Sequence, residues 1–192
     1  MSAKELIKTN VIEKYFNKLL SKEITWIGIF SILTALAAQV AVPTQPVPFT
    51  LQTMFVLLSG AFLGSRNGAY SQVLYLLVGA IGVPVFSNLS FGINVLFGPT
   101  GGYLLAFPVA AYLTGRIIEM KRNSLTVILS MVLSSLVILL VGASYLTTFY
   151  NGNFNQAFFA GAIIFSIWDI IKISAAASIY YSVSKRYPKL PK

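Results

Sequence analysis

Hydrophobic residues occur in six long runs along the 192-residue chain, and short polar or charged connections separate them. Each run is close to the length of about 20 residues that an α-helix needs to cross a bilayer, with about 17 at the short end. The pattern therefore predicts an all-α membrane protein with six transmembrane helices. The predicted helices cover residues 24–42, 49–65, 68–83, 98–115, 124–150 and 158–183.

The segments at the two ends of the chain differ from the runs between them. In residues 1–23, apolar residues recur at roughly helical spacing among lysines. This pattern predicts an amphipathic helix on the cytoplasmic leaflet, where anionic lipid attracts lysine, with a solvated tail as the alternative. The predicted organisation is thus an N-terminal cytoplasmic segment (1–23), a membrane domain (24–184) and a basic cytoplasmic tail (185–192).

The charge distribution predicts the orientation of the chain. Hydrophobic residues make up 56% of it, yet it carries a net charge of +9. All Lys and Arg residues except Lys172 lie in the N-terminal segment, in the C-terminal tail, or in the second and fourth connections between the runs. Cytoplasmic connections carry the excess of positive charge in membrane proteins. We therefore expect both termini in the cytoplasm, and topology explains the charge better than nucleic-acid binding does.

The composition leaves few means for catalysis. There is no cysteine and no histidine, which removes disulfides, thiol catalysis, imidazole bases and most transition-metal sites. No G-x-x-x-x-G-K-[ST] phosphate loop occurs, so the chain is not expected to hydrolyse ATP by the usual machinery. A membrane-embedded enzyme is therefore disfavoured, and we expect no cofactor.

Two charged residues lie inside the last hydrophobic run. Asp169, the only aspartate in the chain, and Lys172 are three residues apart and so share one face of the predicted helix. A charged side chain at the centre of a membrane helix costs roughly 2.5–3.5 kcal/mol on insertion scales, so such residues usually face the protein interior or a wet cavity. A ligand site is favoured over a self-satisfied ion pair and over a proton relay.

The predicted ligand site lies beneath two outer connections. The first, 42–53, contains three prolines and ends near Gln52, and the second, 83–99, is long and rich in aromatic residues. Loops of that length are usually functional. We expect the lining to include Gln52, Asn88, Tyr103, Asp169 and Lys172. Aromatic walls would come from Phe86, Phe91 or Phe97.

Small residues recur every fourth position near the end of the first run. Ala37 and Ala41 are one such pair, and Thr34 and Ala38 are another. Small residues at this spacing allow a second helix to approach closely in lipid. The pattern fits a partner interface and internal packing equally well.

Four sequence blocks together resemble a known family. PVPFTLQT (46–53), YLLVGAIGVPVF (75–86), FGPTGGYLLAFP (97–108) and WDIIK (168–172) are similar to blocks of the biotin-specific substrate-capture subunits (BioY) of energy-coupling-factor (ECF) transporters. The similarity extends over residues 24–185. It implies the S-component fold, a multi-pass protein of a prokaryotic cell membrane, and high affinity for biotin as the transported ligand.

The resemblance also implies partners and roles for individual residues. The expected partners are a transmembrane coupling (T) subunit and two cytoplasmic ATPases. The family's aspartate and lysine match Asp169 and Lys172, its loop asparagine matches Asn88, and Ala37 and Ala41 match positions that dock on the coupling subunit. Asp169 would accept the ureido N–H groups, while Lys172 would pair with the carboxylate or donate to the ureido oxygen. The alternatives are another small carboxylated vitamin or a non-transport membrane scaffold; thiamine is disfavoured because Lys172 would repel a cation.

Overall fold

A computed structural model describes residues 22–187 and 190, and almost all of its regular structure is helical. The predicted N-terminal amphipathic helix lies outside the described residues. The elements are α2 (Glu23–Gln39), β1 (Ala41–Val42), β2 (Phe49–Thr50), α3 (Gln52–Ala80), η1 (Ser87–Leu89), α4 (Ile93–Phe97), α5 (Gly101–Met120), α6 (Ser124–Leu146), η2 (Thr147–Phe149), α7 (Phe154–Phe158), η3 (Phe159–Ile163) and α8 (Ile164–Ser184).

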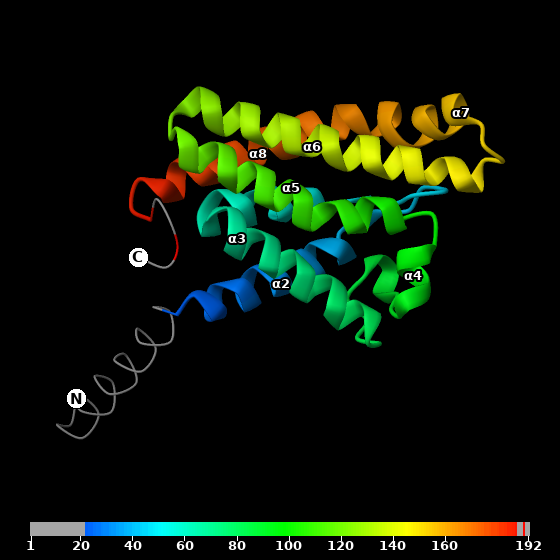
Figure 1. Cartoon of the computed structure of the whole chain (residues 1–192), viewed down its shortest axis with the longest axis horizontal. Coiled ribbons are helices and arrows are strands. Elements are labelled where there is room, and N and C mark those ends of the chain that lie inside the picture. The colour runs from blue at the N-terminus through cyan, green and yellow to red at the C-terminus, as the bar shows by residue number, and fades with distance from the viewer. Residues whose placement is uncertain (1–21, 188–189, 191–192) are drawn as a thin grey trace, which may run out of the picture.

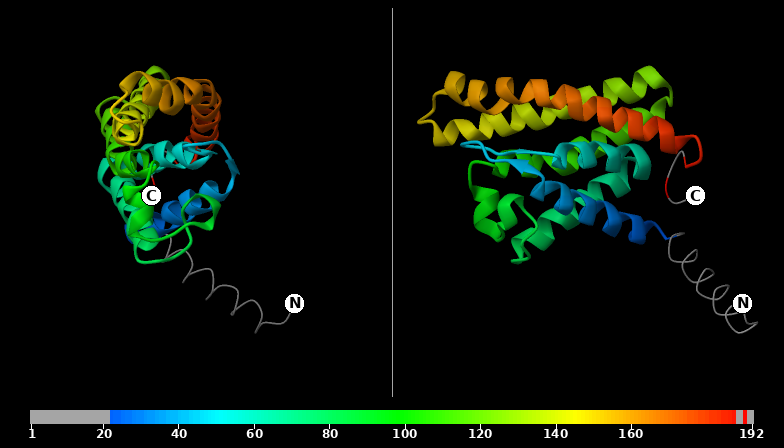
Figure 2. Two further views of the ribbon diagram at one scale, coloured as in Figure 1. Left: turned by 90° about the vertical axis from the view of Figure 1, so that its right-hand side faces the viewer. Right: turned by 180° about the vertical axis from the view of Figure 1, so that it is seen from behind.

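The helices are arranged around α5. Helices α6 and α8 lie on one side of it, and α3 and α2 lie on the other, with α2 packed against α3 (Figures 1 and 2). The start of α2, the connection between α5 and α6, and the end of α8 lie at one end of the molecule. The β1–β2 hairpin, α4 and α7 lie at the opposite end. The predicted basic connections therefore gather at one end and the predicted ligand-capturing loops at the other.

The runs predicted at 49–65 and 68–83 form one element, α3, with a sharp break instead of a loop. Gly64 has φ +81° and ψ −179°, a conformation that glycine adopts without the clash of a Cβ atom. The Glu119 carboxylate on α5 accepts hydrogen bonds from the Ser65 backbone N–H (3.0 Å) and hydroxyl (2.8 Å), so it caps the second half of α3. A Cβ atom at Gly115 would collide with the Ser65 backbone, which explains the close crossing of α3 and α5.

Three helical segments among the described residues are long and apolar enough to cross a membrane. They are Gly101–Met120, Ser124–Phe149 and Phe154–Ser184, while Glu23–Gln39 is apolar but shorter. The last of them begins before the predicted start at residue 158, because α7 and the π-helical turn η3 continue into α8. The count of six spans remains a prediction, with the two halves of α3 supplying the second and third.

The small residues of α2 pack inside the chain. Ala37 and Ala38 are buried, as are Ser31 and Thr34, and α2 packs on α3. Ala41 lies in β1 and is partly exposed. Internal packing therefore accounts for Ala37 in the folded chain, and docking of a partner on this position would require α2 to move.

Candidate functional site

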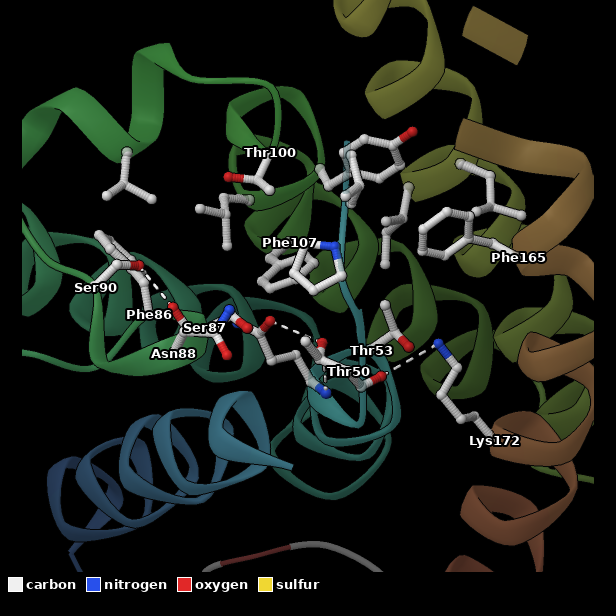
Figure 3. Close-up of a pocket in the computed structure, with 18 of the residues that line it drawn as sticks. Thr50, Thr53, Phe86, Ser87, Asn88, Ser90, Thr100, Phe107, Phe165 and Lys172 are labelled. Carbon is white, nitrogen blue, oxygen red and sulfur yellow. Dashed lines mark hydrogen bonds between the residues drawn. The ribbon is translucent and has the colours of Figure 1, made fainter. Parts of the chain in front are cut away.

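A cavity of about 280 Å³ lies beneath the β1–β2 hairpin and the 83–99 connection (Figure 3). Small-molecule sites are usually about 300–1,000 Å³ in volume and mostly apolar, with a few placed polar groups. The volume of this cavity is close to the lower limit of that range, and its lining is mostly apolar with a few polar groups. Its lining residues are Val47, Pro48, Thr50, Gln52, Thr53, Phe86, Ser87, Asn88, Ser90, Val95, Thr100, Tyr103, Leu104, Phe107, Ile138, Leu139, Phe165, Asp169 and Lys172.

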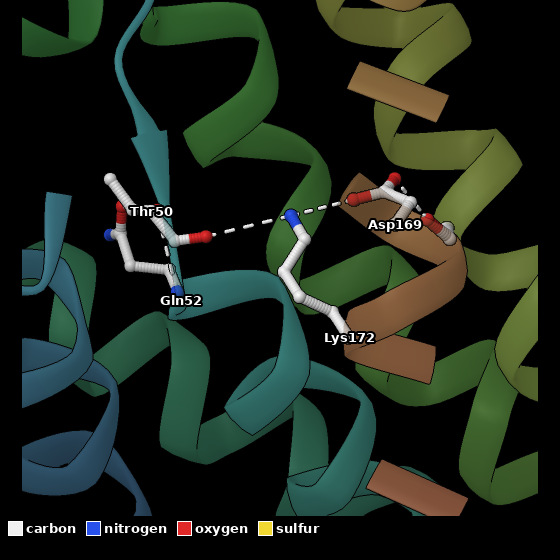
Figure 4. Close-up of polar contacts among 5 residues, drawn as sticks. Thr50, Gln52, Asp169 and Lys172 are labelled. Atoms are coloured by element: carbon white, nitrogen blue, oxygen red, sulfur yellow. Dashed lines mark hydrogen bonds and ion pairs between the residues drawn. The ribbon is translucent and has the colours of Figure 1, made fainter. Parts of the chain in front are cut away.

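The Asp169–Lys172 ion pair forms part of the cavity wall. Lys172 Nζ lies 2.6 Å from Asp169 Oδ1, and both side chains are buried. The Ser135 hydroxyl on α6 donates a 2.5 Å hydrogen bond to Asp169 Oδ2. Lys172 also lies 3.5 Å from the Thr50 carbonyl oxygen, which is a long and weak contact (Figure 4). Both oxygens of the Asp169 carboxylate therefore have partners. The Lys172 ammonium group keeps an N–H donor that can bond to a ligand.

Gln52 is oriented by a chain of hydrogen bonds behind the cavity. The Thr50 hydroxyl donates to Gln52 Oε1 (2.8 Å), Gln52 Nε2 donates to the Tyr75 hydroxyl (2.6 Å), and the Tyr75 hydroxyl donates to the Val85 carbonyl (3.2 Å). These hydrogen bonds link the start of α3, the second half of α3 and the 83–99 connection. Gln52 therefore supports the loop as well as lining the cavity.

Aromatic rings form the wall beside the ion pair. The Phe165 ring lies 4.2 Å from the Phe49 ring and 6.2 Å from the Tyr103 ring, measured between centroids. The Tyr103 hydroxyl donates to the Gly161 carbonyl in the π-helical turn (2.7 Å). A Cβ atom at Gly142 or Gly161 would collide with Tyr103, so both glycines make room for this side chain. The π-turn and the two glycines thus fix the wall next to Asp169.

A second polar region lies across the cavity from Lys172. It consists of Ser87, Asn88 and Ser90, which Figure 3 shows on the side away from Lys172, with Phe107 between them. Asn88 adopts a left-handed conformation with φ +58°, which asparagine tolerates better than most residues. The cavity therefore has polar groups on two sides, with the Phe107 ring between them.

Two hydroxyl groups of residues that line the cavity have no hydrogen-bond partner within the described part of the chain. They are Thr53 Oγ1 and Ser87 Oγ, and both atoms are buried. A buried polar atom without a partner costs about 1–3 kcal/mol. Because both residues line the cavity, a polar ligand or water in it would satisfy these atoms.

The structure brings together five of the six residues predicted from the sequence. Asp169, Lys172, Gln52, Asn88 and Tyr103 all line the cavity, whereas Phe91 is exposed and lies outside it. Among the predicted aromatic candidates, Phe86 lines the cavity and Phe97 does not.

Sequence reasoning missed other residues of the site. Phe107 lines the cavity from inside an apolar run, where no sequence signal distinguishes a ring that faces a cavity from one that faces lipid. Phe165, four residues before Asp169, shares its helix face and also lines the cavity. Ser135 was missed because it is one of several serines in α6.

The chemistry of the cavity suits a small, largely apolar molecule with polar groups at both ends. A carboxylate has about four lone-pair sites and an ammonium group three donors, so Asp169 and Lys172 retain hydrogen-bonding capacity after pairing. Hydrogen bonds to charged groups in a buried site are stronger than those between neutral groups. The pair can therefore accept N–H bonds from a ligand and donate to its carbonyl or carboxylate oxygen.

Comparisons with known proteins match the chain to one family and to several of its members. A sequence model of the BioY family matches residues 8–189. The chain is 40% identical over 159 residues to a probable biotin transporter BioY of Pyrococcus horikoshii, covering 83% of this chain and 94% of the relative. It is 38% identical over 158 residues to the biotin transporter BioY of Thermotoga maritima, covering 82% of this chain and 93% of the relative.

A solved structure has the same fold. It is a crystal structure at 2.1 Å of the S-component for biotin from an ECF-type ABC transporter. The TM-score is 0.80 at 22% sequence identity, and the match covers 97% of this chain and 95% of that chain. The predicted S-component fold is therefore confirmed.

Proposed function

We propose that this chain, which belongs to the BioY family, binds biotin in the cavity of Figure 3 and delivers it for import as the substrate-binding subunit of an ECF transporter. The chain is a multi-pass protein of a prokaryotic cell membrane. The observation that carries the biotin assignment is the buried Asp169–Lys172 pair in the cavity wall, opposite a second polar region. Biotin has a ureido ring at one end and a carboxylate at the other, with an apolar body between them.

The residues of the cavity complement biotin in either orientation. In the first, Asp169 accepts the ureido N–H groups, Lys172 donates to the ureido oxygen, and the carboxylate lies near Ser87, Asn88 and Ser90. In the second, the ligand is reversed and Lys172 pairs with the carboxylate. Rings from Phe107 and Phe165 contact the apolar body in both orientations.

Biotin amide, which lacks the carboxylate charge, distinguishes the two orientations. If Lys172 pairs with the carboxylate, Lys172→Ala removes most of the difference in affinity between biotin and biotin amide. If the carboxylate lies near Asn88, Asn88→Ala reduces that difference and Lys172→Ala weakens both ligands equally. The comparison uses calorimetric titration of each variant with each ligand.

Import requires partners that supply energy. We infer that a transmembrane coupling subunit and two cytoplasmic ATPases drive transport, while this chain binds the substrate without converting it. The coupling subunit would contact the lipid-exposed surface or a rearranged α2, since Ala37 is buried in the folded chain. Co-purification of the tagged chain with these subunits, followed by subunit identification, tests the assembly.

The fate of the ligand tests the proposed function. Purified protein is incubated with a mixture of biotin, thiamine and riboflavin, washed, and denatured, and the released compounds are identified by mass spectrometry. A biotin carrier releases unchanged biotin alone. Release of a chemically altered product indicates an enzyme, retention of a different vitamin indicates another substrate, and retention of nothing by folded protein contradicts the proposal.

A further inference from the structure

Four large apolar side chains project outward from the connection between α3 and α5. They are Leu89, Phe91, Ile93 and Phe97, which we call the loop patch, and each is between 56% and 68% exposed. None of them lines the cavity. Exposed apolar groups clustered in one segment usually mark a contact surface.

The opposite side of the same connection is fastened to the fold. Phe86 is buried, its ring packs edge-to-face on Tyr75 at 5.5 Å, and a Cβ atom at Gly79 would collide with it. Gln39 at the end of α2 donates to the Phe86 carbonyl (3.0 Å) and accepts from the Leu89 backbone N–H (3.0 Å). The connection is therefore held on its inner side, and the outward position of the loop patch follows from the fold.

The loop patch continues the apolar surface of the helices on either side of it. Exposed residues recur along the second half of α3 at Tyr70, Leu74, Leu77 and Ile81, and along α5 at Leu105, Val109 and Tyr112. In a membrane protein, such stripes face lipid. No charged residue occurs between Arg66 and Arg116, so no charge in the connection requires exposure to water.

We propose that the loop patch lies in the interfacial region of the bilayer and contacts lipid in place of water. Apolar and aromatic side chains without accompanying charge favour the boundary between headgroups and acyl chains. The same connection supplies Ser87, Asn88, Ser90 and Val95 to the cavity wall. One wall of the cavity is thus anchored to the membrane surface through its outer side.

A fluorophore on a single introduced cysteine tests this placement. The chain has no native cysteine, so Phe91→Cys provides one labelling site, and its side chain is exposed and outside the core. The matched control is Gln45→Cys in the loop between β1 and β2, an exposed polar position at the same end of the molecule and outside the segments long enough to cross a membrane. Both variants are labelled with NBD and reconstituted in phosphatidylcholine vesicles with or without lipids that carry a doxyl quencher on the acyl chain.

The label at position 91 is expected to emit at shorter wavelength than the label at position 45, with about twice the quenching by shallow doxyl lipids, as in an interfacial segment. Ile93→Cys should behave like Phe91→Cys, which guards against a local effect of one substitution. Equal emission and equal quenching at positions 91 and 45 in folded protein would overturn the proposal. A blue shift that appears only in native membranes, and not in pure lipid vesicles, would also overturn it, because the contact would then be with protein.

Discussion

The Ser135 hydroxyl on α6 donates a 2.5 Å hydrogen bond to the Asp169 carboxylate on α8, on the oxygen that does not face Lys172. This bond connects two helices at the wall of the cavity. It fixes the rotation of the carboxylate, so that its remaining lone pairs keep one direction. Asp169 is therefore positioned before a ligand arrives, and the preorganisation lowers the entropy lost on binding.

Replacement of Ser135 tests this positioning. Ser135→Ala is expected to raise the dissociation constant of biotin about three- to tenfold, because Asp169 loses one of its two fixed partners. The control is Ser130→Ala on the same helix, since the buried Ser130 hydroxyl bonds to the Val127 carbonyl of its own helix. Calorimetric titration of both variants gives the comparison. Equal weakening in both would show that the effect comes from altered packing of α6.

A single and a double variant distinguish the structural role of the Asp169–Lys172 ion pair from its role in binding. Lys172→Ala leaves a buried, unpaired carboxylate, and breaking such a pair costs about 3–5 kcal/mol of stability. The double variant Asp169→Asn, Lys172→Met removes both charges and should recover most of the melting temperature. It should nevertheless remain at least about tenfold weaker than wild type for biotin. A double variant that is stable and binds biotin like wild type would show that the pair has no part in recognition.

Replacement of Thr53 is expected to change stability and biotin affinity in opposite directions. Its buried hydroxyl has no partner in the described part of the chain, so Thr53→Val is expected to stabilise the ligand-free protein by about 1–3 kcal/mol. The same change should weaken biotin binding if this hydroxyl bonds to the ligand, because Thr53 lines the cavity. Thr34→Val is the matched control. It removes a hydroxyl that donates to the Phe30 carbonyl (2.9 Å) and should destabilise the protein. If Thr53→Val binds biotin with unchanged affinity, the hydroxyl does not contact the ligand.

Tyr103 should act mainly through stability. Tyr103→Phe leaves the Gly161 carbonyl in the π-helical turn without its donor, at an expected cost of about 1–3 kcal/mol. Tyr145→Phe removes an exposed bond to the Phe97 carbonyl (3.2 Å) and should change stability by less than about 0.5 kcal/mol. Thermal unfolding in detergent compares the two. Equal melting temperatures would mean that the Tyr103–Gly161 bond does not hold the turn.

The sequence predicted the centre of the site because charge inside a hydrophobic run is rare and costly. Asp169 and Lys172 were therefore conspicuous, and their spacing placed them on one face of a helix. Gln52 and Tyr103 were found because each lies where an outer connection meets a hydrophobic run. Asn88 was expected from its place in the second outer connection, and the family resemblance gave it the same role.

The remaining residues depended on tertiary packing that no local pattern contains. Ser135 gives no sign that its hydroxyl meets Asp169 across two helices. Phe86 lines the cavity while Phe91 does not, since Asn88 and Leu89 both have positive φ and turn the chain between the two rings. The break in α3 at Gly64 was read as a loop because Arg66 interrupts the hydrophobic run. Small side chains at the crossing with α5 allow the break without a loop.

Biotin titration of the purified wild-type protein beside Asp169→Asn tests the central claim most directly. The account predicts nanomolar binding by wild type and a dissociation constant at least about tenfold higher for the variant, equivalent to about 1.4 kcal/mol or more. Folding of both proteins is checked by their melting temperatures in the absence of biotin. Folded wild type that does not bind biotin, or an Asp169→Asn variant that binds as tightly as wild type, would contradict the account.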